Sequence, residues 1–384
     1  MRNEAESLAA RGLSVRVLAP RAAGQPASAR INGVEVRRFR AFRARGSKFS
    51  YALEYAVAHV QLCSRALAAL VRGARVIHFH GPPDTLFAAG LAARMAGRRV
   101  VFDLHDSGPE LFAAKFGAAP ALLALMRAAQ RAAIRSASHV IVTNESQREL
   151  VRVRGGCREE RVSIVRNGVR RSEFPEPQAA RPGALAEPRL IYVGALDRQD
   201  GVLELATLLA HPALARARLT VVGDGPLRNE LADRCHATGV GGRVSFTGQV
   251  PHARVAALIA GADVGVDPAP GTPLNHGSTM IKVMEYMGAG RPLVAYDLRE
   301  TRRSAGPAAL YAPCGERDVL AELIAELARD GERRARLGRR GRERALSLSW
   351  EHSAAVLQQA YDRLGAGDGH RTRKSAARRP VTEP

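Results

Sequence analysis

The chain has 384 residues, enough for about two to three domains of ordinary size. Its residues are 46% hydrophobic and 25% charged, which excludes a wholly disordered or collagen-like protein. It has no run of roughly 18 apolar residues and no N-terminal signal pattern, so we expect a cytoplasmic protein without a membrane-spanning helix. The four cysteines stand far apart without a CxxC pair, which argues against a disulfide framework and a zinc site.

The formal net charge of +21 favours an anionic partner, such as nucleic acid, a membrane surface or a phosphorylated substrate. All but four of the 58 basic residues are arginines, however, and they are spread along the whole chain. We therefore attribute the positive charge mainly to a compositional bias toward arginine, with most arginines on solvated faces. Aromatic residues make up 5% of the chain and no docking motif is present, so we expect no specific nucleic-acid partner. A peripheral contact with an anionic inner membrane face is an expectation from charge alone.

Short β-branched runs alternate with longer helical patterns along the chain, which predicts βαβ units on parallel sheets. The first half opens with a helical pattern at 1–12. Its predicted strands are 14–18, 34–39, 76–79, 100–104, 139–143 and 162–165, and its further predicted helices are 51–71, 85–95, 119–135 and 146–154. The predicted strands of the second half are 190–193, 219–222, 244–246, 264–266, 293–295 and 309–311.

A segment with four prolines at 175–188 predicts a linker between two Rossmann-like halves. We expect an N-terminal domain at 1–174, a C-terminal domain at 189–345, an amphipathic final helix at 346–364 and a disordered basic tail at 365–384. A doubly wound domain normally opens with a strand and a glycine-rich turn. Because the chain opens with a helical pattern instead, either the true start lies upstream, which we favour, or the N-terminal domain lacks its first strand.

Polar side chains follow the predicted strands of the first half. His105 and Asp106 come after 100–104, and we interpret the segment from there to Lys115, including Glu110, as a polar loop. An imidazole there could orient a substrate hydroxyl or bind a sugar, although a His beside an Asp is also a common structural pair. His80 ends the preceding strand and could face the same place or simply pack there. Asn144 ends the next strand, where helix capping is an adequate alternative.

The second half holds the most specific motif, a polar loop that opens a helix before a strand. This loop consists of Gly277, Ser278 and Thr279. Helix N-terminal amides favour an anion. Lys282, one of four lysines, and Glu285 lie three residues apart and therefore share a helix face. Lys282 could neutralise a diphosphate while Glu285 accepts hydrogen bonds from ribose hydroxyls. The alternative is an ordinary surface ion pair. Gly194, at a strand end, suits close approach of backbone amides to phosphate.

These clusters together resemble the retaining GT-B glycosyltransferases of the family 4 (group 1) type. The resemblance rests on the segments DLHD, TNES, GALDRQDG, VGDGP and above all STMIKVMEYMGAGRP, and it covers the chain to about residue 364. It implies two Rossmann-like domains facing a cleft, with the nucleotide-sugar bound by the C-terminal domain and the acceptor by the N-terminal domain. It also implies a final helix that crosses back, retention of anomeric configuration, and no metal or other cofactor.

The resemblance also implies residue roles. Glu285 would bind the donor ribose, and Gly194 with the 277–279 loop would approach the diphosphate or sugar. His105, with Asp106 beside it, would act near the reacting sugar. We place four further residues on the acceptor side: His80, Glu110, Lys115 and Asn144.

Three positions depart from the pattern of the family. Gly277 stands where the family often has Glu, and Ala195 and Asp200 stand where it commonly has Arg and Lys. Two expected cations at the diphosphate are therefore missing. We hypothesise that Lys282 and Arg198 replace them.

The sequence thus predicts a hexosyl-type glycosyltransferase that moves a sugar from a nucleoside diphosphate to a glycan or lipid-linked acceptor, as in polysaccharide biosynthesis. One alternative is a sugar-nucleotide epimerase of the same architecture, which would need no acceptor. The other is a degenerate, non-catalytic GT-B binding protein, favoured by Ala195 and Asp200.

Overall fold

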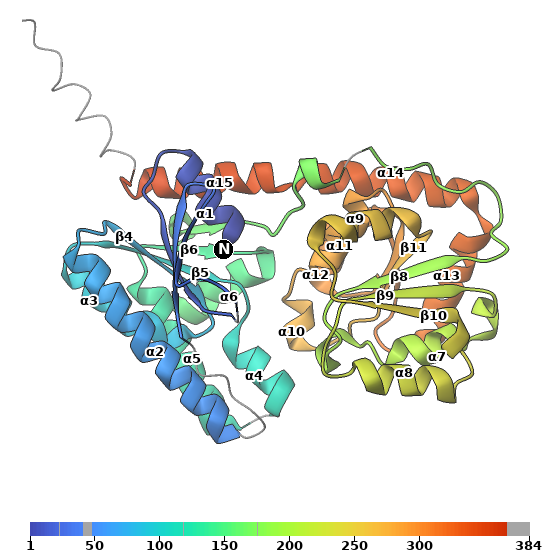
Figure 1. The fold of residues 1–384 in the computed structure, drawn as a ribbon, viewed down its shortest axis with the longest axis horizontal. Coiled ribbons are helices and arrows are strands. Elements are labelled where there is room, and N and C mark those ends of the chain that lie inside the picture. The colour runs from blue at the N-terminus through green and yellow to red at the C-terminus, as the bar shows by residue number, and fades with distance from the viewer. Residues whose placement is uncertain (23, 41–47, 118, 175, 367–384) are drawn as a thin grey trace, which may run out of the picture. The chain divides into compact units, whose positions relative to one another are not determined.

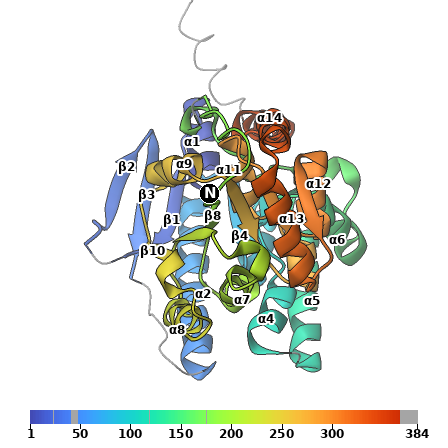
Figure 2. The ribbon, with the colours of Figure 1, turned by 90° about the vertical axis from the view of Figure 1, so that its right-hand side faces the viewer.

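The computed structural model describes residues 1–22, 24–40, 48–117, 119–174 and 176–366. The predicted disordered tail lies outside the described residues from 367 onward. The chain divides into two compact units. The first unit comprises residues 1–113, 118–165 and 354–384, and the second comprises 114–117 and 166–353. Figures 1 and 2 show the elements from two directions.

The first half of the chain alternates strands and helices as predicted. Its elements are α1 (Arg2–Ala10), β1 (Arg16–Pro20), β2 (Ser28–Ile31), β3 (Val34–Phe39), α2 (Lys48–Val71), β4 (Val76–Gly81), α3 (Phe87–Met95), β5 (Arg99–Leu104), α4 (Gly108–Phe116), α5 (Pro120–Ser136), β6 (His139–Val142), α6 (Glu145–Gly155) and β7 (Val162–Ile164). The segment interpreted as a polar loop after β5 is largely the helix α4. The prediction missed this helix because Pro109 was taken as a loop residue, although proline suits the first turn of a helix.

Two sheets form in the first unit. Strands β4, β5, β6 and β7 make a parallel sheet in that order, and β1, β3 and β2 make a second one (Figure 2). Strand β2 pairs antiparallel with β3, which corrects the expectation of parallel pairing throughout. Asn32 and Gly33 join them with φ values of 47° and 83°. Two positive φ values are what a two-residue hairpin turn requires, so the Asn-Gly pair explains the extra strand.

The sheet β4–β7 has one apolar face and one face that carries polar groups. Ile77, Phe79, Val100 and Phe102 alternate along β4 and β5 and pack with residues of α2, α3 and α5. Successive strand residues point to opposite faces. The residues between them, including His78, His80 and Asp103, therefore lie on the other face. The register places His80 directly beside Asp103.

The second half of the chain continues the alternation. Its elements are β8 (Arg189–Val193), α7 (Glu204–Leu209), β9 (Arg218–Val222), α8 (Arg228–Ala237), β10 (Val244–Gly248), α9 (His252–Gly261), β11 (Val264–Asp267), α10 (Pro273–His276), α11 (Ile281–Gly288), β12 (Leu293–Tyr296), α12 (Arg299–Ala305), β13 (Ala309–Ala312), α13 (Arg317–Arg329), α14 (Gly331–Ser347) and α15 (Trp350–Arg363). The residues of α15 from Ala354 onward belong to the first unit.

Six parallel strands form the sheet of the second unit, in the order β10-β9-β8-β11-β12-β13. This is the doubly wound order, in which the chain reverses direction across the sheet between its first and fourth strands. One buried layer joins the sheet to α7, α8 and α13, and another joins it to α9, α11 and α12. Ligands in such sheets bind outside the carboxyl ends of the strands at the reversal, here between β8 and β11.

Some arginines are buried and have a structural role, although we expected most of them on solvated faces. Arg334 is 1% exposed, and its guanidinium donates to four backbone carbonyls, those of Leu327, Ala328, Arg181 and Gly183. Arg243 likewise donates to the carbonyls of Leu209, Leu214 and Ala217. A guanidinium has five donors, which makes it able to hold several loop carbonyls at once.

Within the described residues, no helix is both long and apolar enough to cross a membrane.

Candidate functional site

Two glycines bring strand-end loops of the second unit into backbone contact. Gly194 follows β8 with a φ of 152°, and Gly223 follows β9 with a φ of 133°. A Cβ at Gly223 would lie 1.9 Å from the carbonyl oxygen of Gly194. A Cβ at Gly194 would lie 3.0 Å from Lys282 Cε and from Tyr192 Oη. A side chain at Gly223 would therefore collide with the neighbouring loop, and one at Gly194 would require the side chains of Lys282 and Tyr192 to move.

Lys282 lies buried at the reversal point. It is 6% exposed, and its Nζ is 2.9 Å from Asp200 Oδ1 and 3.5 Å from Asp267 Oδ1. The ammonium also lies 5.1 Å from the ring centre of Tyr192. Burial alone would lower the pKa of Lys282, but the carboxylates of Asp267 and Asp200 outweigh that effect and raise the pKa well above its ordinary value. Lys282 is therefore a permanent cation held between two carboxylates.

Glu285 lies one helical turn further along α11 and is also buried, at 6% exposure. Its Oε1 is 3.6 Å from His252 Nδ1, and His252 Nε2 is 3.3 Å from Glu173 Oε2. Burial raises the pKa of Glu285 to about 7, although His252 pulls it down. The carboxyl therefore changes charge near neutral pH. Lys282 and Glu285 are not the surface ion pair considered as an alternative, since both are buried and Lys282 pairs elsewhere.

The predicted glycine-hydroxyl loop joins α10 to α11 in the structure. Its three residues, Gly277, Ser278 and Thr279, are all partly exposed. Ser278 Oγ donates to the carbonyl of Leu274 at 2.8 Å, which turns its hydroxyl back onto α10. Thr279 directly precedes Met280, the N-cap residue of α11. The loop therefore lies at the start of α11, on the same segment of chain as Lys282 and Glu285.

Arg198 comes from the segment that follows β8. It is exposed and begins the short helix η4 (Arg198–Asp200), which ends at the ion-pair partner of Lys282. The predicted donor-binding residues of the second unit thus come from the segments that follow β8 and β11, the two strands at the reversal.

Three imidazoles and a carboxylate converge in the first unit. Asp103 is fully buried, and its Oδ2 lies 3.1 Å from His80 Nδ1, 3.2 Å from His105 Nε2 and 3.3 Å from His78 Nε2. Burial would raise the pKa of Asp103, but hydrogen bonds from these imidazoles hold it well below its ordinary value. The same carboxylate raises the pKa of His105 against the effect of burial. Burial lowers the pKa of His80 to about 4.

Two residues from distant helices complete this cluster. Glu4 on α1 is 4% exposed, and its Oε2 lies 3.8 Å from His80 Nδ1. Tyr361 on α15 places its hydroxyl 2.8 Å from His78 Nδ1. Burial raises the pKa of Glu4, with Asp103 adding to the effect. The cluster therefore joins α1, β4, β5 and α15 of the first unit.

The remaining predicted residues of the first half belong to other local networks. Glu110 Oε1 accepts a hydrogen bond from Arg154 Nη2 at 2.7 Å. Asn144 caps α6, its side chain accepting from the amide of Gln147 at 2.9 Å, which agrees with the capping alternative. Lys115 is exposed near the end of α4, and Asp106 is partly exposed just after β5. His80 and His105 are thus brought together, with Nδ1 and Nε2 2.9 Å apart.

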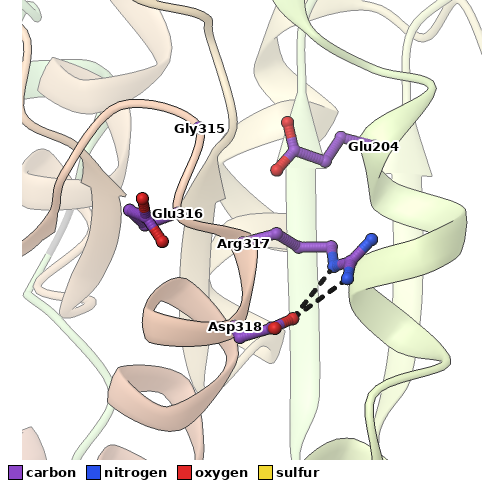
Figure 3. A pocket seen from close by; sticks show the side chains of 5 residues that line it. All are labelled: Glu204, Gly315, Glu316, Arg317 and Asp318. Carbon is purple, nitrogen blue, oxygen red and sulfur yellow. Dashed lines mark hydrogen bonds and ion pairs between the residues drawn. The ribbon is translucent and has the colours of Figure 1, made fainter.

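A separate hollow of about 320 Å³ lies between the start of α7 and the loop before α13. Figure 3 shows its lining, in which Arg317 pairs with Asp318. Glu204 on the opposite wall accepts a hydrogen bond from the Tyr296 hydroxyl. None of the predicted donor-binding residues lines this hollow.

Two family profiles match consecutive parts of the chain. Residues 1–168 match the glycosyl transferase 4-like domain, and residues 187–330 match the glycosyl transferases group 1 domain. The chain belongs to the group 1, family 4-type glycosyltransferases. The resemblance inferred from the motifs is confirmed.

Curated relatives of this glycosyltransferase carry the same activity class in their names. It is 25% identical over 319 residues to the alpha-D-kanosaminyltransferase of Streptomyces kanamyceticus, covering 77% of this chain and 75% of the relative. It is 26% identical to the 2-deoxystreptamine glucosyltransferase of the same organism, covering 75% and 76%. It is 31% identical to the phosphatidyl-myo-inositol mannosyltransferase of Mycobacterium leprae, over 47% and 45%.

Solved structures share the fold of this glycosyltransferase. Sucrose-phosphate synthase from Thermosynechococcus elongatus superposes with a TM-score of 0.72 at 21% identity, over 96% of this chain and 93% of that one. Anabaena HepE in complex with UDP-glucose superposes with a TM-score of 0.63 at 17% identity, over 92% and 100%. The prediction of two parallel-sheet α/β domains with the GT-B fold is confirmed.

Five residues of the two clusters were not assigned to a site from the sequence: His78, Asp103, Asp267, Glu4 and Tyr361. A signal for the first two was present, because His-x-His on β4 and Asp-x-His at β5 alternate with the strand period and so share a face. Asp267 ends a strand, but nothing local links it to Lys282. Tyr361 lies more than 250 residues from His78 in sequence and carries no local signal.

Proposed function

We propose that the chain transfers a hexose from a nucleoside diphosphate to a hydroxyl group of a glycan or lipid-linked acceptor, with retention of anomeric configuration. The family membership supports sugar transfer in general. The observation that carries the specific proposal is the buried carboxyl of Glu285 on α11, the helix that follows the strand β11 at the sheet reversal. A carboxylate can accept hydrogen bonds from two ribose hydroxyls.

The chemistry demands positive charge where the sugar–phosphate bond breaks. As the bond to the anomeric carbon breaks, negative charge develops on the departing diphosphate, and fixed cations or donors there lower the barrier. Lys282 is a buried cation in this region, and Asp200 is its ion-pair partner. Arg198 is exposed and begins η4, the short helix that ends at Asp200. We assign these two residues to the diphosphate, in place of the family cations that Ala195 and Asp200 do not supply.

The acceptor side of the proposal rests on His105. Asp103 raises the pKa of His105 and fixes the imidazole through Nε2 at 3.2 Å. The backbone carbonyl of His105 also accepts a hydrogen bond from Gln147 Nε2 at 2.7 Å. The contact with Asp103 fixes the imidazole and the bond from Gln147 fixes the backbone that carries it, so the ring can orient a hydroxyl group for attack. Relatives named for 2-deoxystreptamine and for phosphatidyl-myo-inositol support a polyhydroxylated acceptor, either free or lipid-linked.

The test begins with the donor. The full chain is melted with UDP, GDP, ADP, TDP and CDP, and the nucleotide that raises the melting temperature selects the base. The matching nucleoside diphosphate hexoses are then incubated with 2-deoxystreptamine and with phosphatidyl-inositol vesicles. Anomeric NMR of the product reports the stereochemistry. An inverted product would contradict retention, and turnover that requires no acceptor would instead indicate an epimerase.

A matched pair of variants tests the role of Glu285. Glu285→Gln keeps the shape of the side chain but removes its charge, so donor affinity should fall. Glu322→Gln makes the same change at an exposed position on α13 and should leave donor affinity unchanged. Equal donor affinity in both variants would refute the ribose assignment. The epimerase and the non-catalytic binding protein are not favoured by the relatives, whose names are those of transferases.

A further inference from the structure

The cluster around Asp103 has the dimensions of a metal site. One ligand atom from each of Glu4, His78, His80 and Asp103 lies within 4.8 Å of the other three. Asp103 Oδ2 lies 3.1 Å from His80 Nδ1 and 3.3 Å from His78 Nε2, and Glu4 Oε2 lies 3.8 Å from His80 Nδ1. In a tetrahedral zinc site with Zn–N and Zn–O bonds near 2.0–2.2 Å, ligand atoms lie about 3.3–3.5 Å apart. Three separations among these four atoms are therefore close to those between zinc ligands, and the remaining ones are no longer than 4.8 Å.

Hydrogen bonding between the side chains does not satisfy this cluster. Asp103 Oδ2 has two lone pairs but three imidazole nitrogens within 3.3 Å. Its other oxygen, Oδ1, accepts no hydrogen bond from the described residues, and neither does Glu4 Oε2. Both side chains are more than nine-tenths buried. A buried carboxylate oxygen without a partner is costly, and a cation bound to Glu4 Oε2 would remove that cost at Glu4.

A hydrogen bond with a neighbouring side chain orients His78, as is common for histidines that bind a metal. His78 uses Nδ1 for the Tyr361 hydroxyl at 2.8 Å, which leaves Nε2 for the cluster. Metal-binding histidines commonly use their second nitrogen in this way, and the outer partner sets the tautomer. His78 thus turns its Nε2 toward Asp103 Oδ2, while Glu4 turns its Oε2 toward His80.

We propose that Glu4, His78, His80 and Asp103 bind one zinc ion on the polar face of the β4–β7 sheet. Two imidazoles and two carboxylates suit zinc and its first-row neighbours, whereas magnesium and calcium prefer oxygen alone. The ion fastens α1 to the strands β4 and β5, and its role is structural. This inference departs from the expectation of no metal, which rested on the family resemblance and on cysteine spacing. It does not depend on the proposed function.

Cobalt provides the direct test, because tetrahedral Co²⁺ absorbs visible light strongly and octahedral Co²⁺ only weakly. The full chain is freed of metal with a chelator and titrated with Co²⁺, then with Zn²⁺. We expect a tetrahedral spectrum that saturates at one equivalent, is abolished by Zn²⁺ and is unaffected by excess Mg²⁺. An octahedral spectrum, or no saturation at one equivalent, would overturn the proposal.

Variants separate this site from adventitious surface binding. Glu4→Gln removes one ligand with little change of shape, and Tyr361→Phe removes the outer partner of His78. Each should weaken Co²⁺ binding roughly 10- to 100-fold. Glu322→Gln and His236→Ala, at exposed positions of the second unit, are the matched controls and should leave it unchanged. Equal metal affinity in all four variants would refute the site, and the melting curve of each metal-free variant establishes that it is folded.

Discussion

Lys282 and Asp200 form an ion pair at the sheet reversal, with Nζ and Oδ1 2.9 Å apart. The buried ammonium of Lys282 therefore already has a carboxylate partner. Asp267 adds a second carboxylate 3.5 Å from the same nitrogen. The three side chains together carry a net negative charge where the proposed function needs a diphosphate. A bound diphosphate must therefore compete with Asp200, the more exposed of the two carboxylates, for the lysine.

Asp200→Asn should strengthen binding of the nucleoside diphosphate. The substitution keeps the shape of the side chain, removes one repelling charge and frees Lys282 to face the phosphates. We expect a dissociation constant roughly tenfold lower, equivalent to about 1.4 kcal/mol, by isothermal titration calorimetry. Asp233→Asn, on the exposed surface of α8, is the control. Unchanged or weaker binding in Asp200→Asn would exclude Lys282 from the phosphate site.

Donor affinity should rise with pH because Glu285 has a pKa of about 7. The ionised carboxylate accepts two ribose hydroxyls, whereas the protonated form competes as a donor. Ionisation rises roughly tenfold between pH 6 and pH 8 for such a group, so ribose recognition should rise by a similar factor. His252, Glu173 and Lys282 are the charged groups that face this carboxyl.

The phosphates of the ligand also titrate, so the measurement must isolate the ribose. Dissociation constants are compared for the nucleoside diphosphate and its 2′,3′-dideoxy analogue at pH 6 and pH 8. The ratio of the two affinities should grow with pH in the unmodified chain and stay constant in Glu285→Gln. A ratio independent of pH in the unmodified chain would count against Glu285 as the ribose ligand.

Asp84 should make the first unit less stable as pH rises. Burial raises the pKa of Asp84 from 3.8 to about 7, although Gln130 donates to its Oδ2 at 3.1 Å and Arg154 also lowers it. Because the folded pKa lies above the unfolded value, the carboxyl favours folding below about pH 4, and this contribution is lost as pH rises to about 7. Asp84→Asn should therefore raise stability at pH 8 by about 2–4 kcal/mol.

Thermal unfolding at pH 8 and pH 4.5 checks this expectation. The gain in melting temperature of Asp84→Asn should be large at pH 8 and several-fold smaller at pH 4.5. Asp233→Asn should show no such difference. A gain of the same size at both pH values would mean that packing, and not the charge of Asp84, explains the effect.

Arg334→Lys should destabilise the second unit despite keeping the charge. Lysine cannot reproduce the fork that binds four backbone carbonyls, so several buried acceptors would lose their donor. We expect a loss of about 3–5 kcal/mol in the free energy of unfolding, measured by urea denaturation. Arg340→Lys, at an exposed position of the same helix, should change it by less than about 0.5 kcal/mol. Equal effects at the two positions would refute the carbonyl-binding role.

The fold could be predicted from sequence because its strands are short β-branched runs and their alternation with helices specifies a parallel sheet. Strand β2 was missed because its residues carry little apolar pattern, and Asn32-Gly33 was the stronger signal. The α11 motif likewise pointed to Lys282 and Glu285. The partner of Lys282 could not be predicted, since Asp200 lies on another loop and was interpreted as a missing cation rather than as a bound anion.

The cluster around Asp103 in the first unit could also be predicted only in part. Its two halves, His-x-His on β4 and Asp-x-His at the end of β5, are each visible in the sequence as an alternating pattern. Only the register of β4 against β5, with His80 opposite Asp103, brings the halves together. Glu4 and Tyr361 come from helices near opposite ends of the chain, so their approach follows from tertiary packing and no local pattern encodes it.

The contact between Gly194 and Gly223 has a consequence for engineering. A Cβ at Gly223 would lie 1.9 Å from the Gly194 carbonyl oxygen, so Gly223 tolerates no side chain unless a loop moves, and Gly194 has a φ of 152° that other residues rarely adopt. Directed-evolution libraries that aim to alter donor choice should therefore hold these two codons fixed. The neighbouring residues Ala195 and Asp224 can be randomised instead, since both are exposed and a change of side chain there leaves the glycine contact intact.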